Sequence, residues 1–189
     1  TPVGTHFEFV KLALENKKHV ICEKKLTVST DETIELFKLA KRLDLVLFEA
    51  FMYLYHPQYL AAKALLVENF QSLKAISCNF SMPHLSLDDI RYNPKIGGGA
   101  VNDNAIYPAS LLSSIFNCEP CRKHLLLSRD LDYEVDTTGA LIADYNGVIC
   151  TAEWGFGKNY CNQATFTFAD HKISVPRIFS KSATFAIIG

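Results

Sequence analysis

The chain has 189 residues, of which 49% are hydrophobic and 21% charged, a composition that excludes disorder for the bulk of the sequence. Nineteen Lys and Arg residues against twenty Asp and Glu residues give a net charge of -1, so no overall positive field attracts nucleic acid. No apolar run approaches the roughly 20 residues that span a bilayer, and the N-terminus lacks a secretory signal pattern. We therefore expect a cytoplasmic protein with neither nucleic acid nor membrane as a partner.

The first 48 residues alternate helix and strand signals, which is typical of a parallel sheet covered by helices. The predicted elements are a helix, a strand, a helix and a strand, at about residues 6–15, 19–22, 29–43 and 45–48. Capping-box spacing marks both helix starts, with Thr5 and Glu8 in the first and Ser29 and Glu32 in the second. Two parallel strands cannot cover their own faces and edges, so we expect further strands of this sheet to precede the chain in the complete protein.

The middle of the chain predicts a helix over about residues 57–71 and a strand over 75–80. Residues 81–99 hold three glycines and two prolines, which indicates a long functional loop. A helical pattern follows over 100–116, but Pro108 has no amide to bond the carbonyl four residues earlier. This helix must therefore kink at Pro108 or start late.

The remainder is rich in strand signals, at residues 122–128, 141–145, 148–154, 164–168 and 171–175. Asn146-Gly147 is typical of a two-residue hairpin turn, and Ala169-Asp170 predicts another. We expect an antiparallel meander with one face left to solvent or to a partner.

Six cysteines are few for a disulfide scaffold of this length, and they lie in sequence that otherwise reads as core, so we expect free thiols. Cys118 and Cys121 have the spacing of a zinc-ligand pair, but no second pair follows them. We expect no metal site. Zinc binding by these two thiols is the alternative, and elemental analysis tests it.

Four short motifs occur in a characteristic order. They are Thr1-Pro2 with His6; the run His19-Val20-Ile21-Cys22-Glu23-Lys24; the run that begins at Glu49 and contains His56-Pro57; and Gly97-Gly98-Gly99 with Asp103 and Tyr107. Together they resemble the Gfo/Idh/MocA family of oxidoreductases, in particular its dihydrodiol-dehydrogenase-like and sugar 3-ketoreductase-like members.

The resemblance implies an α/β fold in two parts. Residues 1–48 would be the C-terminal remnant of a NAD(P)-binding Rossmann domain, whose phosphate-binding fingerprint would lie before residue 1. Residues 49–189 would be most of a C-terminal α/β domain for substrate binding and dimerisation. The large, mostly antiparallel sheet of that domain would join subunits into a homodimer or a higher homo-oligomer.

The implied chemistry is hydride transfer between NAD or NADP and a sugar or related secondary alcohol or ketone. Lys24 follows a strand at its carboxyl edge, where its ammonium can stabilise negative charge on a substrate oxygen. Tyr107 matches the proton donor of the family, and a cation beside it lowers the pKa of a phenol.

Further site residues follow from the same motifs. Asp103 lies four residues before Tyr107, on the same face of a regular helix, and we expect it and Tyr92 to bind the substrate. The residues expected beside the cofactor are Thr1, Pro2, His6, Glu23, Lys24 and Glu49.

Four positions depart from the family pattern: Val3, Lys25, Leu54 and Asn104 stand where relatives usually have Asn, Pro, Arg and an apolar residue. These departures leave a second hypothesis open. In it the protein is a non-catalytic relative that acts as a ligand sensor or as a dimerisation scaffold. Binding of a nicotinamide cofactor would distinguish the two.

Overall fold

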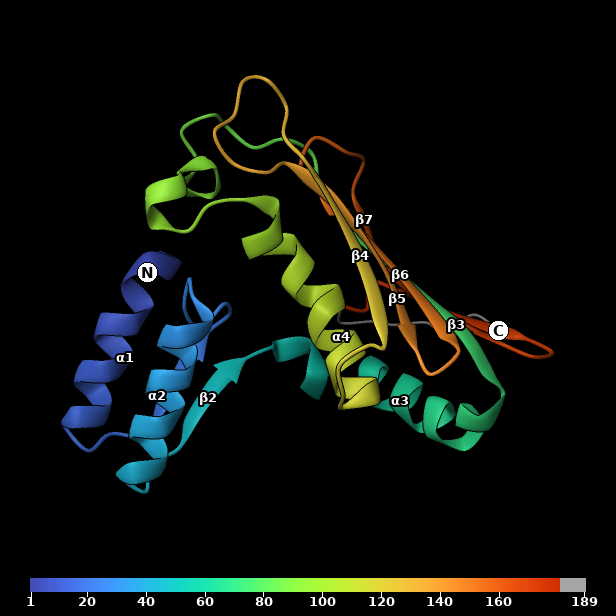
Figure 1. Ribbon diagram of the computed structural model, residues 1–189, viewed down its shortest axis with the longest axis horizontal. Helices are drawn as coiled ribbons and strands as arrows, with labels where there is room; N and C mark the ends of the chain where they lie inside the picture. Colours follow the sequence, from blue (N-terminus) through green and yellow to red (C-terminus); the bar gives the residue numbers. More distant parts are fainter. Residues whose placement is uncertain (181–189) are drawn as a thin grey trace.

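A computed structural model describes residues 1–180 of the chain. Within this range it holds a two-stranded parallel sheet near the N-terminus and a six-stranded sheet built mainly from the second half (Figure 1). Helices α3 (Pro57–Asn69) and α4 (Ile106–Phe116) lie on one side of the larger sheet. The N-terminal part lies beyond α4, so helices separate the two sheets (Figure 1).

The N-terminal part has the expected order of elements: α1 (His6–Glu15), β1 (Val20–Glu23), α2 (Thr30–Arg42) and β2 (Leu47–Ala50). β1 and β2 pair in parallel, from Val20 opposite Leu47 onwards, so the loops that follow them leave the same edge. The predicted cap of α2 is confirmed, because Ser29 Oγ accepts a hydrogen bond from Glu32 N at 3.2 Å.

The predicted cap of α1 is wrong, although the helix itself is present. Thr5 Oγ1 donates to the Pro2 carbonyl oxygen at 2.8 Å instead of capping the helix. The reason is the short 3₁₀ turn Val3–Thr5 that leads directly into α1, so the Thr5 backbone is already helical and its side chain turns back.

Between β2 and α4 the chain builds β3 (Leu73–Ser81) and then the long loop that the sequence predicts. Short 3₁₀ turns occur at Met52–Tyr55, Phe70–Ser72, Ile90–Tyr92 and Pro94–Ile96. A five-residue π-helix, Val101–Ala105, precedes α4, which begins only at Ile106. The α-helix itself therefore starts late, as one of the two predicted outcomes had it, although the backbone is already π-helical from Val101, and Pro108 is the third residue of α4.

The larger sheet adds β4 (Arg122–Ser128), β5 (Thr138–Tyr145), β6 (Val148–Gly155), β7 (Cys161–Phe168) and β8 (Lys172–Pro176). Its strand order is β4-β5-β6-β3-β7-β8. The predicted hairpin at Asn146-Gly147 is confirmed, with positive φ angles of 54° and 91°.

The expected uninterrupted meander is wrong at one point, because β3 lies between β6 and β7. β3 runs parallel to β6 and antiparallel to β7. It is a nine-residue strand with Ile76 and Cys78 buried in the core, so both of its edges need hydrogen-bond partners. Local hairpin signals do not reveal such an insertion from a distant part of the chain.

One face of the larger sheet packs against the helices and the other is uncovered in the described part of the chain. Along β6, Cys150, Ala152 and Trp154 are buried while the residues between them are exposed. On the uncovered face Ile142 and Ile149 are 54% and 44% exposed. No helix among residues 1–180 is long and apolar enough to cross a membrane.

Candidate active site

A cleft of about 240 Å³ opens where the carboxyl end of β1 faces the three glycines of the long loop. Five of the six residues expected beside a cofactor line it: Thr1, Pro2, His6, Glu23 and Lys24. Arg91, Asn102 and Asp103 line it from the C-terminal part. The cleft therefore lies at the carboxyl edge of the parallel strands, where open α/β sheets bind their ligands.

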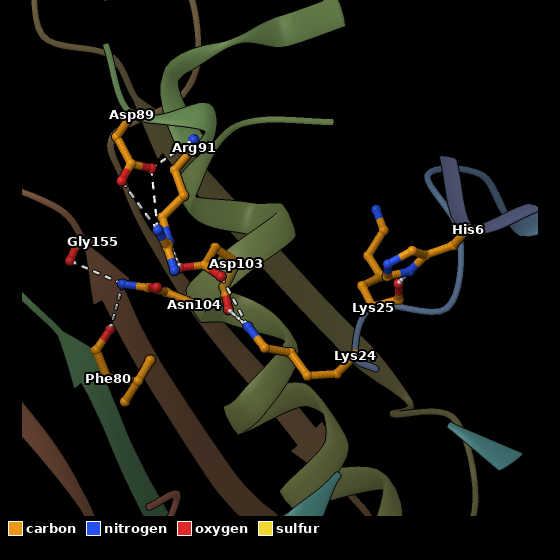
Figure 2. Close-up of polar contacts among 9 residues, drawn as sticks. All are labelled: His6, Lys24, Lys25, Phe80, Asp89, Arg91, Asp103, Asn104 and Gly155. Atoms are coloured by element: carbon orange, nitrogen blue, oxygen red, sulfur yellow. Dashed lines mark hydrogen bonds and ion pairs between the residues drawn. The ribbon is translucent and has the colours of Figure 1, made fainter. Parts of the chain in front are cut away.

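Lys24 extends from the N-terminal side of the cleft to the C-terminal side (Figure 2). Its ammonium nitrogen donates to Asp103 Oδ1 at 2.9 Å and to the Asp103 carbonyl oxygen at 3.2 Å. The same nitrogen lies 4.7 Å from the centroid of the Tyr107 ring, in cation–π contact. The structure thus brings together the three residues Lys24, Asp103 and Tyr107.

Asp103 has a partner on each carboxylate oxygen. Oδ1 binds Lys24, and Oδ2 accepts from Arg91 Nε at 2.9 Å (Figure 2). Asp103 lies in the π-helix, and the neighbouring Asn104 is fully buried and donates to the Gly155 carbonyl oxygen at 3.1 Å. The π-helix is thereby fixed to the end of β6, and it presents Asp103 to the cleft.

Tyr107 lies behind Lys24 and is only 6% exposed, so its ring does not itself line the cleft. The Phe80 ring packs against it at a centroid distance of 4.7 Å, and Phe179 packs at 5.7 Å. Burial raises the pKa of Tyr107 above its ordinary value of 10.0, although Lys24 acts in the opposite direction. The expected pKa-lowering by Lys24 is therefore present but outweighed, and the phenol holds its proton at neutral pH.

His6 lines the cleft and contacts the backbone of Lys25, which lies in the loop after β1. His6 is buried; its Nδ1 donates to the Lys25 carbonyl oxygen at 2.9 Å, and its Nε2 lies 3.2 Å from the Thr1 carbonyl oxygen. Lys25, where relatives usually have Pro, donates through Nζ to Asn102 Oδ1 at 2.6 Å. Burial lowers the pKa of Lys25. Two consecutive lysines thus cross from the N-terminal part to the π-helix.

Besides Tyr107, two predicted site residues do not line the cleft: Tyr92 and Glu49. Tyr92 is buried, and its hydroxyl accepts from Leu85 N and lies 3.1 Å from His84 Nδ1, so it fixes the long loop internally. Glu49 Oε1 accepts from Leu26 N at 2.8 Å, and burial raises its pKa. Glu49 therefore binds the backbone of the loop that follows β1.

Sequence reasoning missed Arg91 and Asp136. Arg91 comes from the long loop, whose only signal was its length and its glycines. Asp136 precedes β5, and its Oδ2 accepts from Val101 N at 2.7 Å at the start of the π-helix. A contact across 35 residues has no local sequence signal.

The cysteines are single free thiols in the part of the chain that the structure describes. All six are free, and Cys118 and Cys121 are exposed. Cys121 Sγ donates to Asn146 Oδ1 at 3.0 Å. Among residues 1–180 no group of three or more His, Cys, Asp or Glu side chains could hold a metal ion.

The fold and the cleft define a class: part of a nucleotide-binding α/β domain joined to a domain with a large mixed sheet. A family model described as "Oxidoreductase family, NAD-binding Rossmann fold" matches residues 1–51. A second, described as "GFO/IDH/MocA C-terminal domain", matches residues 61–173. The chain belongs to the Gfo/Idh/MocA family of oxidoreductases, as its motifs indicated.

Two curated relatives show which reactions occur in similar proteins. The chain is 30% identical over 186 residues to a dTDP-3,4-didehydro-2,6-dideoxy-alpha-D-glucose 3-reductase from Actinomadura kijaniata, covering 97% of this chain and 56% of the relative. It is 34% identical over 147 residues to a D-xylose 1-dehydrogenase (NADP(+)) from Haloferax volcanii, covering 77% and 45%. The chain thus spans about half the length of these relatives.

Solved structures agree with this assignment. A 3-ketoreductase from Actinomadura kijaniata in complex with NADP and TDP-benzene superposes with a TM-score of 0.88 at 28% identity, over 97% of this chain and 57% of that one. An aldose-aldose oxidoreductase from Caulobacter crescentus gives a TM-score of 0.90 at 17% identity, over 97% and 56%, and shows the shared fold alone.

Proposed function

We propose that the complete protein is a NAD(P)-dependent oxidoreductase that transfers a hydride between the nicotinamide and a keto or hydroxyl carbon of a sugar. The observation that carries this proposal is the position of Lys24 at the carboxyl edge of the parallel strands. There its ammonium is held between the Asp103 carboxylate and the Tyr107 ring. The named reactions of the relatives, on keto-sugars and on xylose, support it.

The residues present fit the nicotinamide end of a dinucleotide cofactor. The cleft lies beyond the carboxyl end of β1 and is lined by Thr1, Pro2, His6 and Glu23, with the Lys24 ammonium at its inner wall. These residues would hold the cofactor, and the bound nicotinamide would supply or accept the hydride.

Lys24 and Tyr107 then act on the oxygen of the reacting carbon. The Lys24 ammonium donates a hydrogen bond to that oxygen and stabilises the negative charge that develops there during reduction. The Tyr107 phenol, whose pKa burial raises, does not line the cleft, so its proton reaches the oxygen through the Lys24 ammonium that contacts its ring: Lys24 gives a proton to the oxygen and takes one from Tyr107.

The uncovered face of the larger sheet supports assembly with a second copy of the chain. Ile142 on β5 and Ile149 on β6 are exposed on it, and Thr151 lies in register between Ile142 and Ser77. An uncovered sheet face of this kind favours self-association over solvent exposure. We place the protein in the cytoplasm, where its six free thiols would remain reduced.

The test is a fluorescence titration of the complete protein with NADPH and NADH, followed by turnover assays with dTDP-linked 3-keto sugars and with free aldoses. We expect saturable binding of at least one nucleotide and its oxidation in the presence of a keto-sugar. A protein that folds but binds neither nucleotide would instead be the sensor or scaffold of the second hypothesis.

A further inference from the structure

Four charged side chains of alternating sign form a connected series of ion pairs from the long loop to the cleft: Asp89, Arg91, Asp103 and Lys24 (Figure 2). Arg91 Nη1 donates to Asp89 Oδ1 at 3.1 Å, and Arg91 Nε donates to Asp103 Oδ2 at 2.9 Å. Lys24 is the last residue of this series, and its Nζ donates to Asp103 Oδ1 at 2.9 Å. The side chains of Asp103 and Lys24 are only 22% and 17% exposed, so solvent screens their pairing weakly.

The backbone of Arg91 is fixed from both sides. The Asp89 side chain accepts a hydrogen bond from Arg91 N at 2.9 Å, and the Arg91 carbonyl accepts one from Gly99 N at 2.8 Å. A Cβ atom at Gly98 would lie 2.6 Å from the Arg91 carbonyl oxygen, closer than real contacts allow. The triple glycine therefore lets the chain pack directly on Arg91, which sets where its guanidinium points.

We propose that Arg91 is a positioning residue, which orients the Asp103 carboxylate and through it holds the Lys24 ammonium at the cleft. A carboxylate bound on both oxygens to different cations cannot rotate without breaking one of the two charge-assisted bonds. Without Arg91, Oδ2 of Asp103 loses its partner and the carboxylate is free to turn away from Lys24. The role in turnover rests on the proposed function; the effect on Lys24 does not.

The kinetic test compares Arg91→Met with Lys95→Met, which changes an exposed lysine of the same loop. We expect Arg91→Met to lower kcat about tenfold to a hundredfold, as misplacement of a reacting group does, with cofactor affinity unchanged and KM altered less than kcat. Lys95→Met should behave as wild type. Arg91→Lys should recover part of the loss, because it restores a cation but not the two-sided geometry of the guanidinium.

A double-mutant cycle separates positioning from direct binding. If Arg91 acts through Asp103, Arg91→Met has little further effect in an Asp103→Asn background. If the two losses multiply, Arg91 acts independently, for example on an anionic group of the substrate, and the proposal is overturned. A dominant rise in KM for Arg91→Met would overturn it in the same way.

A measurement without turnover keeps the proposal testable if the complete protein proves inactive. The rate of Lys24 acetylation, followed by peptide mass spectrometry, reports how firmly the ammonium is held. We expect Arg91→Met and Asp103→Asn to raise this rate several-fold, because the ammonium loses a partner that holds it, and Lys95→Met to leave it unchanged. Asp89→Asn leaves Arg91 itself in place and should therefore raise the acetylation rate less. Equal rates in wild type and Arg91→Met would refute the positioning role whatever the activity is.

Discussion

The two sheets of this protein differ in how they are supported. The two-stranded sheet has a small core around Leu14, Leu26 and Leu36, and Ile21 on β1 is 78% exposed. The six-stranded sheet has a continuous aromatic core that includes Tyr53 and Phe166. The cation of the site comes from the first part and the groups that bind it come from the second.

This difference shows where the geometry of the site is decided. Lys24 follows a short strand, and a lysine side chain has many rotamers. Asp103 and Tyr107 lie on a helical segment packed against the larger sheet, so they are the rigid reference. The better-packed part therefore fixes the position of a side chain that the smaller part supplies.

The largest effect is expected for a substitution of Lys24, the cation that the N-terminal part contributes to the site. Lys24→Met should lower turnover by about a hundredfold or more, because the developing charge on the substrate oxygen loses its cation. Lys18→Met, at an exposed lysine of the same part, is the matched control. A loss of less than about fivefold in steady-state kcat would exclude Lys24 from the chemistry.

The next largest effect is expected for Tyr107→Phe, which removes the phenol hydroxyl and keeps the aromatic ring. Tyr107→Phe should lower the reductive kcat about tenfold to a hundredfold and leave thermal stability nearly unchanged, since the contacts with Phe80 and Lys24 involve the ring. Tyr55→Phe, at a tyrosine that is 65% exposed, is the control.

The pH dependence of the reductive kcat tests the contribution of Tyr107, a residue of the better-packed part. Because burial holds the pKa of Tyr107 above 10.0, the proton donor stays protonated through neutral and mildly alkaline pH. The wild-type reductive kcat should therefore show no decline from Tyr107 until the pH exceeds that value. A decline centred near neutrality that is lost in Tyr107→Phe would contradict the burial effect.

A fourth experiment addresses the uncovered face of the larger sheet. Ile142→Glu places a charge on that face, in the middle of β5, and should convert the oligomer to monomers in sedimentation velocity, while circular dichroism stays unchanged. Val67→Glu, at an apolar residue of α3 that is 69% exposed, should leave assembly intact. If wild type is monomeric at all concentrations, the proposed interface is wrong.

The smallest effect concerns Glu49 in the N-terminal part. Its pKa is raised in the folded state by burial, so its ionisation costs stability as the pH rises through that pKa, and the cost is absent at low pH. Glu49→Gln keeps an acceptor for Leu26 N and should raise Tm slightly at neutral pH, with the difference vanishing in acid. Glu68→Gln, at an exposed position, should show no such pH-dependent gain. A marked loss of cofactor affinity in Glu49→Gln would restore the original cofactor assignment.

The sequence determined most of the local structure and the family. The serine cap of α2, the Asn146-Gly147 hairpin and the late start of α4 each depend on residues a few positions apart, so their signals are contained in short segments. The ordered motifs around Lys24 and Tyr107 likewise identified the oxidoreductase family before any contact was known.

Only the tertiary structure decided which of these residues meet. Three features depend on packing between distant segments. They are the position of β3 between β6 and β7, the ion pair of Arg91 with Asp103, and the contacts that Tyr92 and Glu49 make outside the cleft. The protonation of Tyr107 is decided in the same way, because neighbours from several elements bury its ring. Local patterns specify the elements, and the burial that assembles them specifies the chemistry.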